Sequence, residues 1–175
     1  MGATTPEEYG DYFAWGETEP KDEYSWSTYK YCNGSSTTMT KYCTGSEYGT
    51  VDNKTVLELE DDAANINWGG NWRMPTKTEQ DELRDTNNCT WEWITQNGVN
   101  GYKVTSKVNG NSIFLPAAGY YYSTLVGVGS EGYYWANNLL SSNSNGPDNL
   151  YCGIYGVGYG AAIRYVGKSV RTVCN

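Results

Sequence analysis

The chain contains no histidine among its 175 residues. This absence excludes Ser-His-Asp and Cys-His nucleophilic sites and removes the commonest general base. It also makes a zinc site improbable, because none of the five cysteines belongs to a CxxC pair. No loop carries the alternating acidic spacing of a dedicated calcium site either. We therefore expect no required metal and no cofactor.

Basic residues are scarce, with 12 Lys and Arg against 20 Asp and Glu and a formal net charge of −8. A nucleic-acid-binding domain needs a clustered basic face, so we expect no nucleic-acid partner. The chain also lacks any apolar run near the roughly 18 residues that span a membrane, and it lacks a signal-like leader. We predict no direct membrane insertion, and any leader would lie outside this chain.

Phenylalanine is almost absent, with two residues against 17 Tyr and 7 Trp. The interior must therefore be built largely from rings that carry a polar group. A length of 175 residues fits one domain over 1–175 that buries about 70% of the surface of the unfolded chain. A core of this size does not depend on disulfides.

The hydrophobic pattern predicts an α+β fold with one or two short helices, short antiparallel strands and much irregular loop. A helix is expected from Thr76 to Asp85, because Pro75 precedes it and acidic residues occupy its first turns. A shorter helix is expected over Leu57–Ile66, with its carboxylates facing water. The expected strands are TWEWIT, GYKVTS, SIFLPAAGYYY, GYYWA, LYCGIYG, IRYVG and SVRTV, separated by turn signals such as the Asn-Gly pairs at 97, 100 and 109.

The stretch Asn137–Ile163 has an unusual composition, because it contains no Lys, Glu, Gln, Met or Trp. Every residue in it can be encoded by a codon that ends in a pyrimidine, whereas those five cannot. Adenine-targeted randomisation of AAC or AAT codons would produce this alphabet. The alternative is a Gly, Asn and Ser-rich loop system with no such history.

The cysteines suggest two disulfides. Cys32 and Cys43 flank a polar turn and are predicted to form a local bridge, and Cys89 and Cys174 are predicted to tie the C-terminus to the middle of the chain. Cys152 is then left over. It is either a position whose identity was not selected for structure or a packed free thiol.

Several blocks carry a family resemblance: AANINWGGNWRMPTKTEQDEL at 63–83, NCTWEWI, NGYKVTSKVNGNSIFLPAAGYYY, GYYWA and RYVGKSVRTV. This order resembles a paralogous domain noted in Fibrobacter and common in Bacteroidetes surface proteins, and it extends over nearly the whole chain from Gly10. The WRMPT, NSIFLPAAG and YxGxSVRxV blocks are jointly specific. The resemblance implies a C-type lectin-like fold in its formylglycine-generating-enzyme-like form. It also implies a location at the bacterial cell surface, outside the cell or on a phage particle.

Relatives with this fold include the variable proteins of diversity-generating retroelements, in which mutagenic reverse transcription rewrites adenines near the C-terminus. The resemblance implies a variable region within 133–171 and a receptor or adhesin surface that binds a protein or another macromolecule. Tyr151, Tyr155 and Tyr159 are the leading contacts, although Tyr159 could be a fixed structural ring. Alternate glycines would leave a depression between these tyrosines. The predicted ligand-binding residues are Asn137, Asn138, Leu139, Leu140, Tyr151, Gly153, Ile154, Tyr155, Gly156, Gly158, Tyr159, Gly160, Ala161, Ala162 and Ile163.

Other functions remain as alternatives. Formylglycine-generating enzymes need a cysteine pair in a local motif that Cys152 and Cys174 lack, so the fold does not imply that activity. The acidic run Glu58–Asp62 would suit a glycosidase, but such a run is usually a solvated helix face, and we expect no enzyme. A fixed glycan-binding module would use exposed tryptophans. A purely structural module would use neither these tryptophans nor the predicted variable surface. The candidate tryptophans are Trp15, Trp26, Trp91 and Trp93.

The beginning of the chain departs from the family. Such domains usually start with a strand that contains a segment like LWATCNVGA, and this chain starts at the equivalent of its last residues. The resemblance implies that this strand would pair near the C-terminus. Its absence would leave an open sheet edge available for dimerisation or partner-strand addition.

Overall fold

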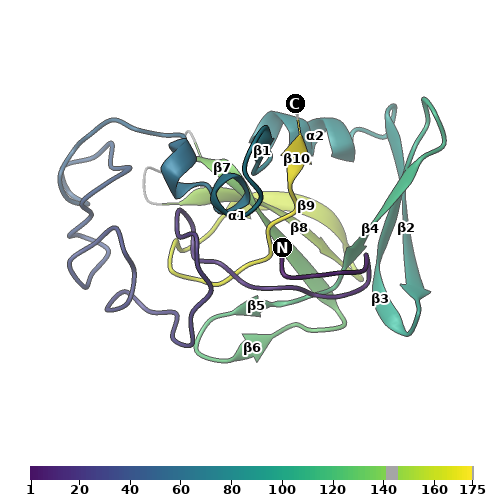
Figure 1. Cartoon of the computed structure of the whole chain (residues 1–175), viewed down its shortest axis with the longest axis horizontal. Helices are drawn as coiled ribbons and strands as arrows, with labels where there is room; N and C mark the ends of the chain where they lie inside the picture. The colour runs from purple at the N-terminus through teal and green to yellow at the C-terminus, as the bar shows by residue number, and fades with distance from the viewer. Residues whose placement is uncertain (141–145, 175) are drawn as a thin grey trace.

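The computed structural model describes residues 1–140 and 146–174 and shows an α+β molecule dominated by short antiparallel strands (Figure 1). This confirms the predicted α+β class. Its helices are short: the 3-10 helix η1 (Leu59–Asp61), α1 (Ala63–Trp68) and α2 (Lys77–Arg84). In the described residues, no helix is long and apolar enough to cross a membrane.

Helix α2 forms where the sequence predicts it, because its N-terminal signals are local. Thr76 is the N-cap and its hydroxyl accepts a hydrogen bond from the Glu79 amide, while the Glu79 carboxylate accepts one from the Thr76 amide. The Arg73 guanidinium donates two hydrogen bonds, of 2.8 and 2.6 Å, to the Glu79 carboxylate. These contacts fix the angle at which the chain enters α2.

The second predicted helix, Leu57–Ile66, is divided into two pieces. Asp62 has extended backbone angles, and its buried carboxylate accepts hydrogen bonds from the amides of Ala64, Asn65 and Met74. It therefore caps α1 and separates it from η1. The expectation that all carboxylates here face water is also wrong, since Asp61 and Asp62 are each 2% exposed.

The described residues form two three-stranded antiparallel sheets, ordered β2-β3-β4 and β7-β8-β9, and two strand pairs, β1-β10 and β5-β6. Figure 1 shows the β2-β3-β4 sheet on one side and most of the irregular chain before η1 on the other. The strands are β1 (Trp72–Arg73), β2 (Cys89–Gln96), β3 (Val99–Ser106), β4 (Ser112–Pro116), β5 (Tyr120–Tyr121), β6 (Leu125–Val126), β7 (Glu131–Leu139), β8 (Pro147–Gly153), β9 (Gly156–Ala161) and β10 (Val173–Cys174).

The C-terminal strands differ from the prediction. LYCGIYG is not one strand, because β8 ends at Gly153, the chain turns, and β9 begins at Gly156. The segments IRYVG and SVRTV contribute isolated bridges, at residues such as Gly167 and Ser169, and the start of β10. The physical reason is that Arg164–Val170 passes through the interior between several elements rather than along one strand. Every residue of this segment is buried.

The predicted Asn-Gly turns at Asn97 and Asn100 have different outcomes in the structure. Asn97 and Gly98 both have positive φ, of 49° and 83°, and form the two-residue connection between β2 and β3. Asn100, also followed by Gly, lies instead inside β3 and pairs with Thr95. The difference arises because Asn97 already makes the turn, which places Asn100 in the returning strand.

The core consists of two clusters and is rich in aromatic rings, as the composition predicts. The larger cluster joins the irregular N-terminal region to Trp135 and Val170, and the smaller one lies between the two three-stranded sheets. Buried polar ring atoms have partners: Trp15 Nε1 donates to the Ala136 carbonyl at 2.9 Å and Trp135 Nε1 donates to the Phe13 carbonyl at 2.8 Å. These bonds offset the cost of burying indole N–H groups.

Neither predicted disulfide is formed in the structure. Cys32 and Cys43 are free thiols, and each Sγ lies within hydrogen-bond distance of a backbone carbonyl, at Trp26 and Gly45 respectively. The backbone of Cys32 forms an isolated antiparallel β-bridge with Met39, not with Cys43. Cys89, the proposed partner of Cys174, is also a free thiol.

Candidate ligand-binding surface

The exposed part of the predicted variable region lies on β9 and on the turn that precedes it. Tyr155 is 90% exposed at the tip of the turn, and Ile154 and Tyr159 are each about half exposed. Among the described residues β9 pairs with β8 alone, so its other edge is open. Ala161 and Ile163 are exposed, whereas Tyr151, Gly156, Gly158, Gly160 and Ala162 are half-buried.

Three of the predicted contact residues, Asn137, Leu139 and Gly153, are buried in the structure instead of lying on the exposed surface. Asn137 is held by backbone hydrogen bonds to Leu57 and Pro75, and Leu139 is part of the larger core cluster. Gly153 has little space for a side chain, because a Cβ there would lie 3.1 Å from the Ser130 carbonyl oxygen and 2.7 Å from the Tyr151 hydroxyl. These positions are therefore structural.

Asn138 and Leu140 are half-buried and also belong to the supporting structure. The Asn138 side chain accepts a hydrogen bond from the Lys77 amide at 2.9 Å and donates one to Asp148 at 3.0 Å. It thereby joins the first turn of α2 to β8. Leu140 donates its amide to the Gly146 carbonyl at 2.9 Å. Positions 141–145, which the composition also included in the variable region, lie outside the described residues.

Strand alternation separates the tyrosines onto two faces of the β7-β8-β9 sheet. Tyr151 pairs with Gly158, and Leu150 pairs with Tyr159, so Tyr151 and Tyr159 project in opposite directions. The predicted depression between these tyrosines is therefore wrong. Tyr159 lies on the face toward α2, where Lys77 Nζ and the Arg84 guanidinium lie 4.2 and 4.8 Å from its ring centroid.

We call the opposite face, which carries Tyr151, the glycine face. It is made of three cross-strand rows: Glu131, Gly153 and Gly156; Tyr133, Tyr151 and Gly158; Trp135, Asn149 and Gly160. A Cβ at Gly158 would contact only the Tyr151 ring, at 3.9 Å, and a Cβ at Gly156 or Gly160 would meet nothing within 4 Å. The backbone of β9 is bare on this face, as predicted.

Aromatic rings continue across the glycine face. Tyr120 and Tyr133 have centroids 4.9 Å apart in an edge-to-face arrangement, and Tyr133 and Tyr151 have centroids 5.1 Å apart. The Tyr133 hydroxyl donates to the Glu131 carboxylate at 3.2 Å. Burial raises the pKa of both Tyr133 and Tyr151, and the charge of Glu131 raises each further. The next residue in this cross-strand row is Gly158 on β9, so no ring follows Tyr151.

Lys168 supports this face from within and was not predicted from the sequence. It is 4% exposed, its Nζ donates to Asn149 Oδ1 at 2.8 Å, and Asn149 in turn donates to the Gly160 carbonyl. Its ammonium group lies 4.4 Å from the Trp135 ring centroid. Burial lowers the pKa of Lys168 to about 7. The signal in the sequence was a lysine between apolar residues in YVGKSV.

The acidic run is neutralised by lysines. Carboxylate oxygens of Glu58, Glu60 and Asp61 lie within 4.8 Å of one another, but Lys41 pairs with all three. Burial of Asp61 opposes its ionisation, yet hydrogen bonds from Lys41, two tyrosine hydroxyls and a second lysine outweigh burial and lower its pKa to about 2. This arrangement is typical of an ion-pair network that stabilises the fold rather than of a pair of catalytic carboxylates.

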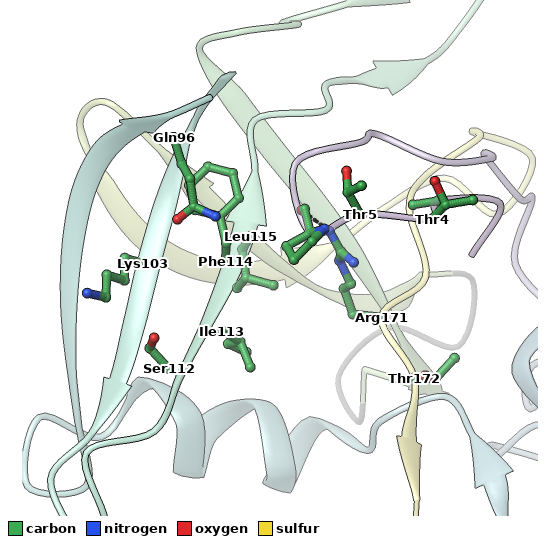
Figure 2. A pocket seen from close by; sticks show the side chains of 12 residues that line it. Thr4, Thr5, Gln96, Lys103, Ser112, Ile113, Phe114, Leu115, Arg171 and Thr172 are labelled. Atoms are coloured by element: carbon green, nitrogen blue, oxygen red, sulfur yellow. Dashed lines mark hydrogen bonds between the residues drawn. The ribbon is translucent and has the colours of Figure 1, made fainter. Parts of the chain in front are cut away.

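A cavity of about 500 Å³ lies away from the variable region (Figure 2). Figure 2 shows side chains from three stretches of chain around it: residues 3–6, the sheet strands with Ser112–Leu115 of β4, and residues 171–172. Its lining residues include no carboxylate, histidine or cysteine, so they offer no acid-base pair. None of the predicted contact residues lines it.

The tryptophans proposed for glycan stacking do not form an exposed platform. Trp15 is fully buried, and Trp26, Trp91 and Trp93 are half-buried against other rings. The exposed tryptophans of the described chain are instead Trp68 and Trp72, at 50% and 36%. Their rings meet at 89° with centroids 5.0 Å apart, so they do not present one flat surface.

The fold and surface thus define an α+β domain with an open, glycine-rich edge strand beside a row of tyrosines. The chain matches no family model, no curated protein and no solved structure. Its interpretation therefore depends on the geometry of this surface.

Proposed function

We propose that this chain is a ligand-binding receptor or adhesin domain of C-type lectin-like fold. Its β9 surface is diversified by a retroelement so that it binds varied macromolecular ligands. One observation carries the proposal. In the described part of the unusual stretch, residues 137–140 and 146–163, the exposed side chains lie in Ile154–Ile163, and burial becomes complete at the next residue, Arg164.

The chemistry of this surface supports a binding role. Tyr155 offers a large amphipathic ring at little conformational cost, and the surrounding glycines give clearance for a partner. Substitutions at the exposed positions of this surface leave the two core clusters intact, whereas Val157 and Ala162 pack against them. The surface is thus suited to changing its ligand while the fold stays constant. The proposed location is the bacterial surface, the secreted fraction or a phage particle.

A fixed glycan-binding module is the second candidate, and the exposed Trp68 and Trp72 rings are the observation that favours it. Stacking on a sugar would use the open face of one ring. A diversified surface would instead depend on Tyr155 and its neighbours. Alanine variants of each group therefore separate the two candidates in any binding assay with an identified ligand.

The first experiment is to sequence the encoding locus. The proposal expects a near-identical copy of codons 133 to 171 and a neighbouring reverse transcriptase gene, with differences confined to adenines of the copy. The structure adds that these differences should affect exposed codons such as 154, 155 and 163 more than the buried codons 137, 139 and 153. A locus without a repeat, or with differences at all four bases, would contradict the proposal.

A further inference from the structure

The glycine face has one residue outside the proposed variable region 133–171 and others inside it. Glu131 precedes that region, whereas Tyr133, Tyr151 and Gly158 lie within it. Glu131 shares a row with residues of β8 and β9. At about 4.8 Å between neighbouring strands, its Cα lies roughly 10 Å from β9. A ligand side chain lying across the bare strand could therefore reach a fixed carboxylate.

Glu131 is an acceptor with spare capacity. Its Oε2 accepts a hydrogen bond from the Tyr133 hydroxyl, and among residues 1–140 and 146–174 no lysine or arginine pairs with its carboxylate. The charge of Glu131 is felt along the tyrosine row, since it raises the pKa of Tyr133 and Tyr151. The chain as a whole carries a net charge of −8. The electrostatics therefore favour a cationic occupant.

Lys168 is the positive group nearest the tyrosine row, but its ammonium group is hydrogen-bonded to Asn149 and not to Glu131. Its Nζ lies 5.0 Å from the Tyr133 centroid, but it donates to Asn149 in the neighbouring row and is 4% exposed. Its lowered pKa also reduces its mean charge near neutral pH. Lys168 thus leaves the Glu131 end of the face negative.

The shape of the face selects among cations. A guanidinium is planar, stacks on aromatic rings and forms paired hydrogen bonds with a carboxylate. The aliphatic part of an arginine side chain also packs well on bare backbone. A neutral ring in the same place would cover Glu131 without pairing its charge, which is costly.

We propose that the glycine face takes an arginine side chain of a protein partner, stacked against Tyr151 with its guanidinium on Glu131. This inference rests on the proposed function, because it assigns a ligand chemistry to the same surface. Glu131 supplies a constant anchor for arginine, and the exposed residues around Tyr155 select among partners that present one. Diversification then changes the rim of the site and leaves its charged end unchanged.

The test is an NMR titration of the full chain, labelled with ¹⁵N, with N-acetyl-arginine-methylamide as the probe. We expect saturable shifts of the Gly156, Gly158 and Gly160 amides with an affinity in the millimolar range. The matching citrulline derivative has nearly the same shape without the charge and should bind at least fivefold more weakly. Equal binding of the two probes would overturn the proposal.

Three variants test whether the arginine probe binds at the glycine face. Glu131→Gln should weaken binding of the arginine probe at least fivefold, whereas Glu92→Gln, on the exposed face of β2, should leave it unchanged. Equal weakening by both variants would indicate nonspecific attraction and contradict the proposal. Gly158→Tyr fills the open space beside the Tyr151 ring without altering Glu131, and Gly158 has no positive φ, so the strand should accept it. It should abolish the shifts, and retained shifts would contradict the proposal even if Glu131→Gln failed to fold.

The two proposals fail separately. If the locus shows no diversification but the arginine probe binds through Glu131, the face is a fixed arginine-binding site. If the locus is diversified and the probe fails these tests, the surface is variable but has no arginine anchor.

Discussion

Two adjacent segments of this chain, Ile154–Ile163 and Arg164–Val170, have opposite environments. The first contains a turn tip that is 90% exposed and a strand that is bare on one face, and the second is buried at every residue. The change occurs between Ile163, at 42% exposure, and Arg164, at 0%. Tolerance to substitution in this protein therefore depends on local burial, not on position in the chain.

The polar side chains of the buried segment Arg164–Val170 are held by fixed partners. The Arg164 guanidinium donates to the carbonyls of Lys41 and Tyr42, at 3.2 and 2.6 Å, and lies 5.4 Å from the Trp15 ring centroid. Lys168 is fixed by Asn149. Buried donors that lose such acceptors are expensive, whereas Tyr155 can change with little effect on the core.

The largest expected effect is that of Arg164→Leu. The leucine leaves the Lys41 and Tyr42 carbonyls without their donor and removes the cation from the Trp15 ring, so the free energy of unfolding should fall by about 3 to 5 kcal/mol. Urea denaturation measures this change. The neighbouring Ile163→Asn is the control and should change the free energy by less than about 0.5 kcal/mol. Similar losses for the two variants would remove the contrast between the segments.

The next effect is a pH dependence caused by Lys168. Its folded pKa of about 7 lies below the unfolded value of 10.5. Between these values the unfolded chain binds more protons, so stability rises with pH. From pH 7 to pH 9 the wild type should gain about 2 kcal/mol relative to Lys168→Met.

Denaturation of both proteins across this range isolates Lys168. Other groups that titrate there, such as the Met1 amine with its lowered pKa and Cys152 with its raised pKa, are common to both. Parallel stability curves would show that Lys168 is charged in the interior at all these pH values and would contradict the assignment.

The smallest effect should come from rewriting the exposed segment. Ile154→Asn and Tyr155→Ser, combined with Ile163→Asn, should together lower the free energy of unfolding by less than about 1 kcal/mol, because these side chains are largely in water. Thermal unfolding should show a midpoint shift of a few degrees at most. A cooperative loss of several kcal/mol would mean that the segment is part of the folded framework.

Elements with local signals were the ones that the sequence predicted well. Helix α2 has its capping box in Thr76 and Glu79, and the Asn97-Gly98 turn needs only its own two residues. The division of the helix predicted at Leu57–Ile66 depends on Asp62 reaching the distant Met74 amide, which no local pattern encodes. Strand β9 was absent from the expected strands because its glycines carry little strand propensity, although their alternate spacing did predict a bare strand face.

The candidate site was predictable in composition but not in orientation. The absence of Lys, Glu, Gln, Met and Trp marked Asn137–Ile163, and the bare glycine strand followed from alternation. The opposite directions of Tyr151 and Tyr159 depend on the two-residue turn between β8 and β9, which sets the register. The burial of Asn137 and Leu139 depends on contacts with residues about 60 to 80 positions earlier, such as Pro75 and Leu57.

Cys152 lies on the side of β8 opposite the glycine face, in the smaller core cluster between the two three-stranded sheets. It is 0% exposed, and burial raises the pKa of its thiol to about 12. An alkylating reagent can reach such a sulfur only when the sheets separate. The rate of its modification therefore measures how often the scaffold beneath the proposed binding surface opens, without any probe attached to that surface.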